Sequence, residues 1–156
     1  MKYEILELPE QKYVGIKTVI QFKDHDLIDF KQLHKDVMNA MISHIDHKEN
    51  LMAMDADFTE TSFSYTPLIP VTSYDDNDSF THFTREESTY NAFEVTEEEC
   101  GPEWFQSLFK FIEANGLTVE QTGYDLEYYD YNYDTKPEYQ AEDETDKVFK
   151  ILLKKK

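Results

Sequence analysis

The chain has 156 residues and carries 33 acidic side chains against 15 Lys and Arg, a formal net charge of −18. So acidic a chain offers no basic surface to the phosphate backbone of nucleic acids or to an anionic membrane. The charge favours small cations or basic protein surfaces as partners, or serves solubility alone. Aromatic residues make up 15% of the sequence, too many for a disordered acidic chain, and the length fits one globular domain.

The single cysteine, Cys100, predicts neither a disulfide framework nor a cysteine-based zinc site. The opening MKYEILELPEQKYVGI has acids inside its apolar run and no small-residue cleavage site, which is unlike a signal peptide. No stretch approaches the length of an apolar membrane span. We therefore expect a cytoplasmic protein that does not contact membranes.

The first half of the chain predicts strands, a long helix and another strand. KYEILEL and KYVGIKTVIQF are strands, or one strand broken at Pro9. Residues 24–47 place apolar side chains at helical spacing, and Asp24 or Asp26 can cap that helix. Residues 51–61 are ambiguous.

Residues 62–74 are extended, and Pro67 and Pro70 point to a sheet edge or a break.

The second half repeats this order. A polar loop over 75–87 leads to a strand over 88–98 and a helix over 101–116, with Pro102 in its first turn and Gly116 at its end. The segment YDLEYYDYNYD (124–134) alternates as a strand, a solvated loop follows over 135–145, and DKVFKILLKKK closes the chain as a strand.

The order of elements predicts an α+β domain with one unit used twice. The units cover residues 1–74 and 88–154 of a single domain, 1–156, and form a mostly antiparallel sheet with two main helices.

One face of the strand over 124–134 suits a binding site. Alternate residues of a strand share a face, so Glu127 lies beside Tyr129, with Asp125 and Tyr131 flanking them. A carboxylate among phenol rings can balance a buried cation, and each ring adds roughly 0.5–2 kcal/mol. Partial burial would also let Glu127 act as a general acid or base. The alternative is an exposed strand face dotted with polar and aromatic residues.

Other motifs are weak. His44 and His47, three residues apart on the expected first helix, could hold a metal, but no third ligand has a fixed spacing. No phosphate-binding loop or hydrolase motif is present. Cys100 has no evident histidine partner, so we interpret it as a structural residue. We therefore expect no metal and no cofactor.

Several segments resemble the GyrI-like effector-binding domains found in AraC- and MerR-type regulators and as free-standing proteins. They are YEILELPEQKYVGI, the Gly101-Pro102 turn before a helix, Ala114-Asn115-Gly116 after it, the Glu-x-Tyr of Glu127 and Tyr129, and the closing KVFKILLKKK. The middle of the chain, 51–87, fits loosely.

The resemblance implies two pseudo-symmetric strand–helix–strand–strand repeats with a central groove. In that family a Glu on the penultimate strand, with aromatic walls, forms the floor of a site for lipophilic, often cationic compounds. It assigns this role to Glu127, with Tyr129 and Tyr131 beside it. Tyr65 is expected to mirror them from the first half, and Trp104 to border the groove.

Three functions follow, in order of preference. The first is a free-standing domain that captures a lipophilic or cationic small molecule, for sensing or sequestration of drugs or toxins, without direct contact to nucleic acid. The second is a hydrolase of reactive small electrophiles that uses Glu127 and Tyr129. The third is an acidic inhibitor of gyrase-inhibitor type that binds an unknown protein partner.

Overall fold

The computed structural model describes residues 1–134 and 148–156 of the chain. Within them the chain forms nine strands: β1 (Tyr3–Leu8), β2 (Gln11–Gly15), β3 (Thr18–Gln21), β4 (Met52–Ala56), β5 (Ser62–Val71), β6 (Thr81–Arg85), β7 (Ser88–Thr96), β8 (Asp125–Tyr128) and β9 (Val148–Lys154). The helices are a 3-10 helix, η1 (Phe22–Leu27), and two α-helices, α1 (Phe30–Met38) and α2 (Pro102–Ala114). None of these helices is long and apolar enough to cross a membrane.

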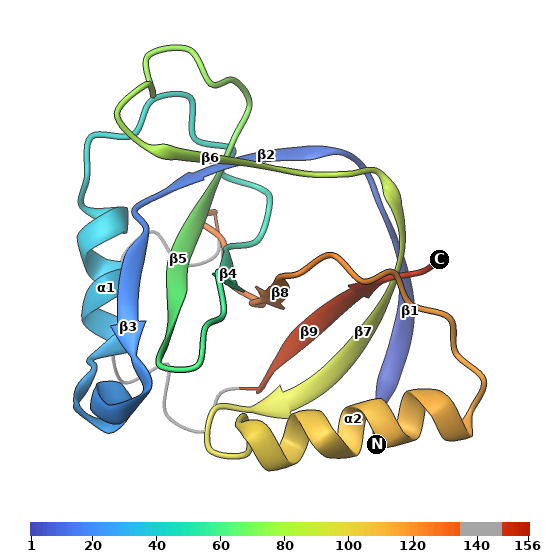
Figure 1. Cartoon of the computed structure of the whole chain (residues 1–156). Helices are drawn as coiled ribbons and strands as arrows, with labels where there is room; N and C mark the ends of the chain where they lie inside the picture. The colour runs from blue at the N-terminus through green and yellow to red at the C-terminus, as the bar shows by residue number, and fades with distance from the viewer. Residues whose placement is uncertain (135–147) are drawn as a thin grey trace.

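The strands form one antiparallel sheet whose two halves meet at β4 and β8 (Figure 1). The order is β1-β7-β9-β8-β4-β5-β2-β6, and β3 also pairs with β5. In the second half the chain runs β7-α2-β8-β9 and lays β9 between β7 and β8. In the first half it runs β3-α1-β4-β5 and lays β5 between β3 and β4. The predicted α+β class with two strand–helix–strand–strand units is confirmed, while the unit boundaries at 74 and 88 stay a prediction.

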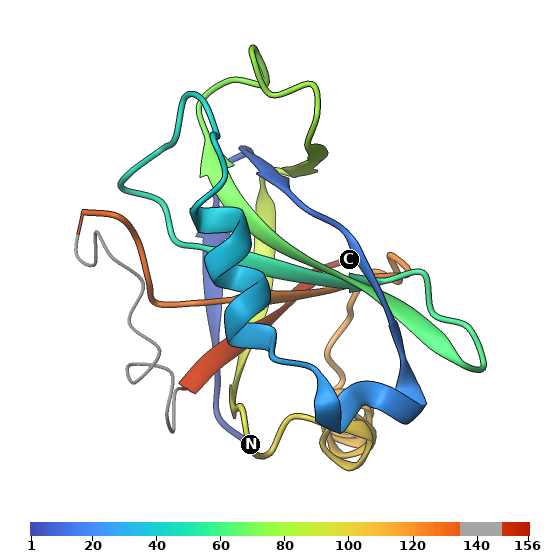
Figure 2. The same ribbon diagram turned by 90° about the vertical axis from the view of Figure 1, so that its left-hand side faces the viewer.

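Both α-helices pack on the same face of the sheet, α1 over the first half and α2 over the second (Figures 1 and 2). Val37 of α1 shares a core cluster with Ile69 of β5, and Leu108 of α2 packs against Phe93 of β7. The opposite face carries a separate apolar core: Tyr13, Met52, Leu68, Tyr90, Ala92, Leu126 and Leu152. The central strands β4 and β8 therefore lie between the two helices.

Of the two alternatives that the prolines predict for residues 62–74, the sheet edge is wrong and the break is present. β5 lies inside the sheet, with β4 on one side and β3 followed by β2 on the other. Pro67 lies where the neighbour changes from β3 to β2, and proline is tolerated where a ladder is interrupted. β2 ends at Gly15, next to Pro67. The position requires glycine, because a Cβ added there would lie 2.1 Å from the carbonyl oxygen of Pro67.

The first helix begins at a different cap from the one predicted. Asp29, rather than Asp24 or Asp26, is the N-cap, and its Oδ1 accepts a hydrogen bond from the backbone N–H of Gln32 at 3.0 Å. The residues before it form the separate turn of η1.

The predicted helix is also wrong beyond Met38. The backbone N–H of Ser43 donates to Oδ1 of Asn77 at 2.9 Å, and Nδ2 of Asn77 donates to the carbonyl of Ser43 at 2.8 Å. Asn77 is fully buried, so a distant side chain supplies hydrogen bonds that a helix would supply internally. Met41, expected on the buried stripe, is 94% exposed.

Three further segments differ from their predictions. The ambiguous residues 51–61 hold β4, and the predicted loop over 75–87 holds β6. The strand predicted over 124–134 ends at Tyr128. The predicted loop over 135–145 lies outside the described residues.

Candidate functional site

The face of β8 that carries Glu127 is turned towards the helices. Glu127 lies between Ala53 of β4 and Ile151 of β9, and both belong to the core cluster on the helix-covered face. Leu126 and Tyr128 pack against the opposite core. The predicted alternation is therefore confirmed in β8, and Glu127 is only 9% exposed.

Glu127 belongs to an acidic cluster with Asp125 and Asp55. Asp125 shares its face of β8, and Asp55 of β4 is the direct cross-strand partner of Asp125. Burial, and then the charge of Glu127, raise the pKa of Asp125 to about 6. Burial, then Glu127, then Asp125 raise the pKa of Asp55 well above its usual range.

No Lys, Arg or His among the described residues forms an ion pair with any member of the acidic cluster. Like charges placed opposite each other across strands destabilise a sheet. The cluster therefore holds negative charge that the described part of the chain does not neutralise.

A hydrogen-bond chain leads from Glu127 across the site to α1. The hydroxyl of Tyr129 donates to Oε1 of Glu127 at 2.7 Å. The hydroxyl of Tyr65 lies 3.4 Å from that of Tyr129, and Nε2 of His34 lies 2.7 Å from the hydroxyl of Tyr65. All four side chains are buried. Burial, and then the charge of Glu127, raise the pKa of Tyr129 well above its usual range, so its phenol stays protonated.

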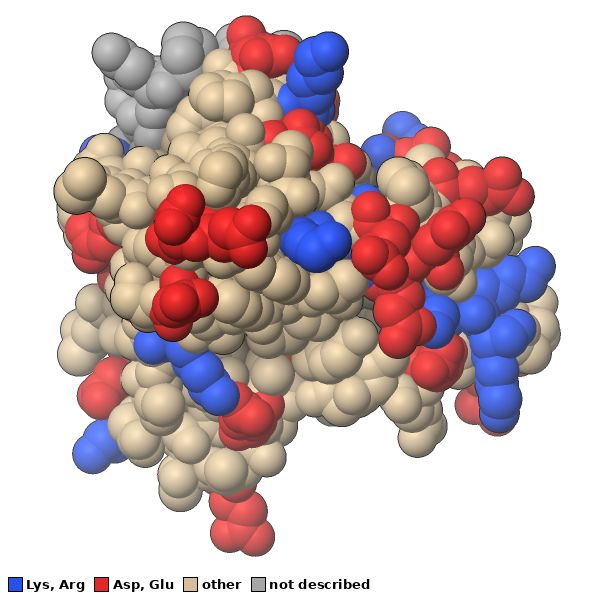
Figure 3. Space-filling model, turned by 90° about the horizontal axis from the view of Figure 1, so that it is seen from above, with Lys and Arg blue, Asp and Glu red and all other residues tan. Residues whose placement is uncertain are grey.

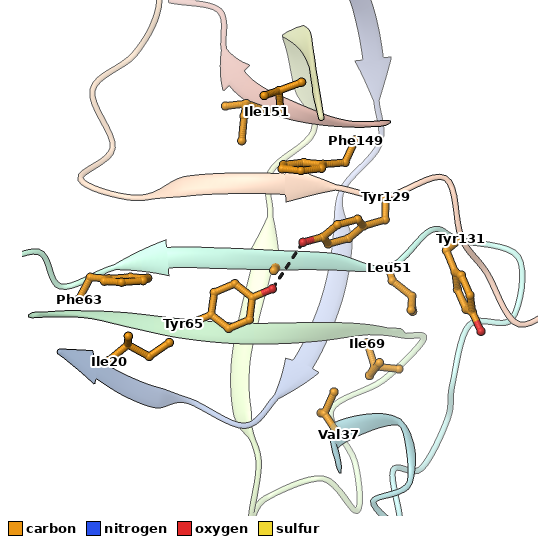
Figure 4. Packing of buried hydrophobic residues seen from close by; sticks show 12 residues of the cluster. Ile20, Val37, Leu51, Phe63, Tyr65, Ile69, Tyr129, Tyr131, Phe149 and Ile151 are labelled. Carbon is orange, nitrogen blue, oxygen red and sulfur yellow. Dashed lines mark hydrogen bonds between the residues drawn. The ribbon is translucent and has the colours of Figure 1, made fainter. Parts of the chain in front are cut away.

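Aromatic rings surround this chain. Tyr65 and Tyr129 point toward one another from the two halves of the sheet (Figure 4). The ring of Phe149 lies 5.4 Å from that of Tyr129, and the ring of Phe30 lies 4.8 Å from that of Tyr65. The site thus combines carboxylates with ring faces, the two components that attract organic cations.

The other two predicted ligand-binding residues have different surroundings. Tyr131 is 1% exposed and packs in the same core cluster, but it lies apart from the Tyr65–Tyr129 pair in Figure 4. Trp104 packs against this cluster from α2. It also borders a cavity of about 570 Å³ beside α2, which Glu94, Glu99 and Phe111 line with it. The structure therefore brings Glu127, Tyr129 and Tyr65 into one chain of contacts and leaves Tyr131 and Trp104 as packing neighbours.

Sequence reasoning missed Asp55, His34 and Cys100 at this site. Asp55 lies in the segment whose pattern is ambiguous, and His34 falls on the apolar stripe of its helix, which predicts a core position. Cys100 precedes α2, where a helix N-terminus would lower the pKa of a thiol. Burial, then the charges of Glu127 and Asp55, instead raise its pKa to about 12.

The histidines considered for a metal do not form a pair on a helix. His44 and His47 lie in the irregular segment after α1, and His44 contacts Asp76 at 3.4 Å. Within residues 1–134 and 148–156, no group of three or more His, Cys, Asp or Glu side chains is arranged to hold a metal ion.

Comparisons with known proteins identify the fold. No family model matches the sequence, and no curated protein matches it. Among solved structures, the protein SAV2435 bound to tetraphenylphosphonium has a TM-score of 0.65 and 14% identity, over 100% of this chain and 94% of that one. The EcmrR C-terminal domain has a TM-score of 0.58 and 14% identity, over 99% of this chain and 97% of that one.

A protein from Staphylococcus aureus MU50 is also similar, with a TM-score of 0.59 and 15% identity, over 100% of this chain and 99% of that one. At such identities the likeness establishes a shared fold. The fold that the resemblance to GyrI-like effector-binding domains implies is therefore confirmed for the part of the chain that the structure describes.

Proposed function

We propose that the protein is a small-molecule-binding domain that takes lipophilic cations at the acidic cluster, in a role of sensing or sequestration. The observation that carries this is one buried carboxylate, Glu127, beside two half-buried ones, Asp55 and Asp125, and tyrosine rings, with no cation partner among the described residues. A buried charge is costly unless it is paired, and a bound cation would supply the pair. The aromatic rings would add cation–π attraction on the same side.

The solved structures give this proposal independent support. SAV2435, which shares the fold, binds tetraphenylphosphonium, a lipophilic cation. Tyr129 holds Glu127 by a hydrogen bond, so the carboxylate is oriented before a ligand arrives.

Thermal unfolding with a pair of probes of opposite charge tests the proposal. Tetraphenylphosphonium and tetraphenylborate have nearly the same shape, so a difference between them reports the sign of the site. A ligand at 100 times its Kd stabilises the folded state by about 2.7 kcal/mol. We expect stabilisation by the phosphonium alone, and its loss in Glu127→Gln.

The matched control is Glu113→Gln, which removes the same charge from the exposed end of α2. This variant should respond like the unaltered protein. Equal stabilisation by both probes, or an unchanged response in Glu127→Gln, would contradict the proposed role of the acidic cluster.

A second candidate function is hydrolysis of a reactive electrophile. It is favoured by the contact between Tyr129, a protonated phenol, and Glu127, because the two could serve as acid and base on one substrate. Product formation that disappears in Tyr129→Phe while binding persists would favour this second function.

The acidic-inhibitor hypothesis has weaker support. On the face seen in Figure 3, the acidic side chains lie in separate groups with Lys or Arg side chains between them. A mimic of DNA would present a more continuous negative surface.

A further inference from the structure

Three phenylalanine rings form an aromatic stack at one end of the core on the helix-covered face. The ring of Phe63 stacks with that of Phe22 at 5.4 Å and with that of Phe58 at 6.0 Å between centroids, with interplanar angles of 24° and 14°. Phe63 is buried, whereas Phe22 is 45% exposed and Phe58 is 51% exposed. Exposed apolar side chains that adjoin one another mark binding sites more often than single ones do. The two outer rings therefore offer a ligand aromatic surface that the core does not use.

The aromatic stack adjoins the acidic cluster. Asp55 is the cross-strand partner of Tyr65, and Phe63 lies two residues before Tyr65 on the same face of β5 (Figure 4). Diagonal neighbours on one face of a sheet lie about 7–8 Å apart, within reach of aromatic side chains. Phe58 follows Asp55 in the turn after β4, whereas Phe22 follows β3 on the far side of β5. Phe58 is therefore the exposed ring of the stack on the side of the acids.

The turn between β4 and β5 holds the backbone of Phe58 from both sides. Before it, Asp57 has a left-handed φ of 51°, and its Oδ2 accepts a hydrogen bond from the hydroxyl of Ser64 at 2.8 Å. Aspartate adopts this backbone conformation more readily than most residues do. After it, Oγ1 of Thr59 accepts a hydrogen bond from the backbone N–H of Ser62 at 2.9 Å. The exposed ring of Phe58 is thus carried by a turn with a defined conformation.

We propose that the aromatic stack is a specificity subsite of the ligand site, where an aromatic ring of the bound cation stacks on Phe58 while its charge lies at the acidic cluster. This rests on the proposed function and extends it by naming the ligand class, cations that carry aryl groups. Charge complementarity draws a cation to the acids but does not distinguish aryl from alkyl substituents. A stacked pair of rings adds an attraction that an alkyl chain cannot reproduce. Phe58 therefore sets the preference for aryl cations.

Two cations that differ only in their substituents test the proposal by titration calorimetry. Tetraphenylphosphonium and tetrabutylphosphonium both carry one charge on phosphorus, but only the first has rings. Phe58→Leu keeps an apolar side chain without a ring, so it should raise the Kd of tetraphenylphosphonium about threefold to tenfold. The Kd of tetrabutylphosphonium should change by less than about twofold, because it makes no ring contact. Phe58→Tyr, which keeps the ring, should bind both cations like the unaltered protein.

The matched control is Phe109→Leu, because Phe109 is 54% exposed on α2 and does not belong to the aromatic stack. It should leave both affinities unchanged. An equal change for the two cations in Phe58→Leu, or no change for either, would overturn the proposal.

Glu127→Gln separates a failure of this proposal from a failure of the proposed function. It should weaken both cations, because they share the charge, whereas Phe58→Leu should weaken only the aryl cation. If Glu127→Gln weakens both cations but Phe58→Leu treats them alike, the stacking subsite is wrong and the proposed function stands. If the unaltered protein binds neither cation, the proposed function fails and the stacking subsite fails with it.

Discussion

The acidic cluster should make the folded protein less stable at neutral pH, and Asp125→Asn measures by how much. The carboxyl of Asp125 faces Asp55 across the strands and Glu127 along its own strand, and burial with these charges raises its pKa from 3.8 to about 6. The folded state therefore binds the proton of Asp125 more tightly than the unfolded state does. The free energy of unfolding must then fall as the pH rises between these two values.

The size of the effect follows from the two pKa values. A gap of about 2 pH units corresponds to about 3 kcal/mol, reached in full above about pH 7. Asparagine cannot ionise, so Asp125→Asn should raise the free energy of unfolding by up to about 3 kcal/mol near pH 8 and by less than about 1 kcal/mol near pH 4.

Urea unfolding followed by the fluorescence of Trp104, the one tryptophan, gives both free energies. Asp130→Asn is the control, because it removes the same charge from an exposed position just after β8. The reasoning is refuted if Asp125→Asn is no more stable than the unaltered protein near pH 8, or if its advantage is the same near pH 4.

Two further predictions concern the surroundings of the site. Gly15→Ala should lower the free energy of unfolding by about 1–3 kcal/mol, because the added Cβ meets the backbone of Pro67 at 2.1 Å. The control is Gly101→Ala, whose Cβ has nothing within 4 Å and which should lower it far less. Equal losses of stability in thermal unfolding would contradict the explanation. With a pKa of about 12, Cys100 should react with iodoacetamide at pH 8 at least about a hundredfold more slowly in the folded protein than in urea. Similar rates would contradict the rise in its pKa that burial and the neighbouring acids cause.

The parts of the site that the sequence predicts are those set by neighbours along the chain. The alternation from Asp125 to Tyr128 fixes which side chains share a face, but which of the two faces the helices cover follows only from the packing of the whole sheet. The cap and stripe of α2 are similarly local, with Pro102 in the first turn and Gly116 at a φ of 62° after the last.

The parts that the sequence does not predict depend on contacts between distant segments. Asp55 becomes a strand residue because β5 and β8 supply partners on both sides of β4. β6 has the polar composition of a loop. Even its fully buried residue, Arg85, is charged, so no apolar alternation marks the segment as a strand. No local pattern distinguishes His34 from an apolar core residue until Tyr65 lies opposite it.

Arg85 shows how this fold holds a buried cation. On the face of the sheet away from the helices its side chain is fully buried, and Nη1 donates to the hydroxyl of Tyr13 at 2.8 Å and lies 3.8 Å from Oε1 of Glu49. The guanidinium also lies 5.7 and 5.8 Å from the ring centroids of Tyr13 and Tyr128. One carboxylate, one phenol hydroxyl and two ring faces thus hold one positive charge.

The helix-covered face carries the same components around Glu127, namely carboxylates, phenol hydroxyls and tyrosine rings, but the described residues place no cation among them. On the face away from the helices, Glu49 and Tyr13 hold the buried Arg85, whereas no described residue holds the acids of the helix-covered face in this way. The negative charge left on the helix-covered face calls for a positive charge from beyond the described residues, and the proposed binding of a lipophilic cation would supply it.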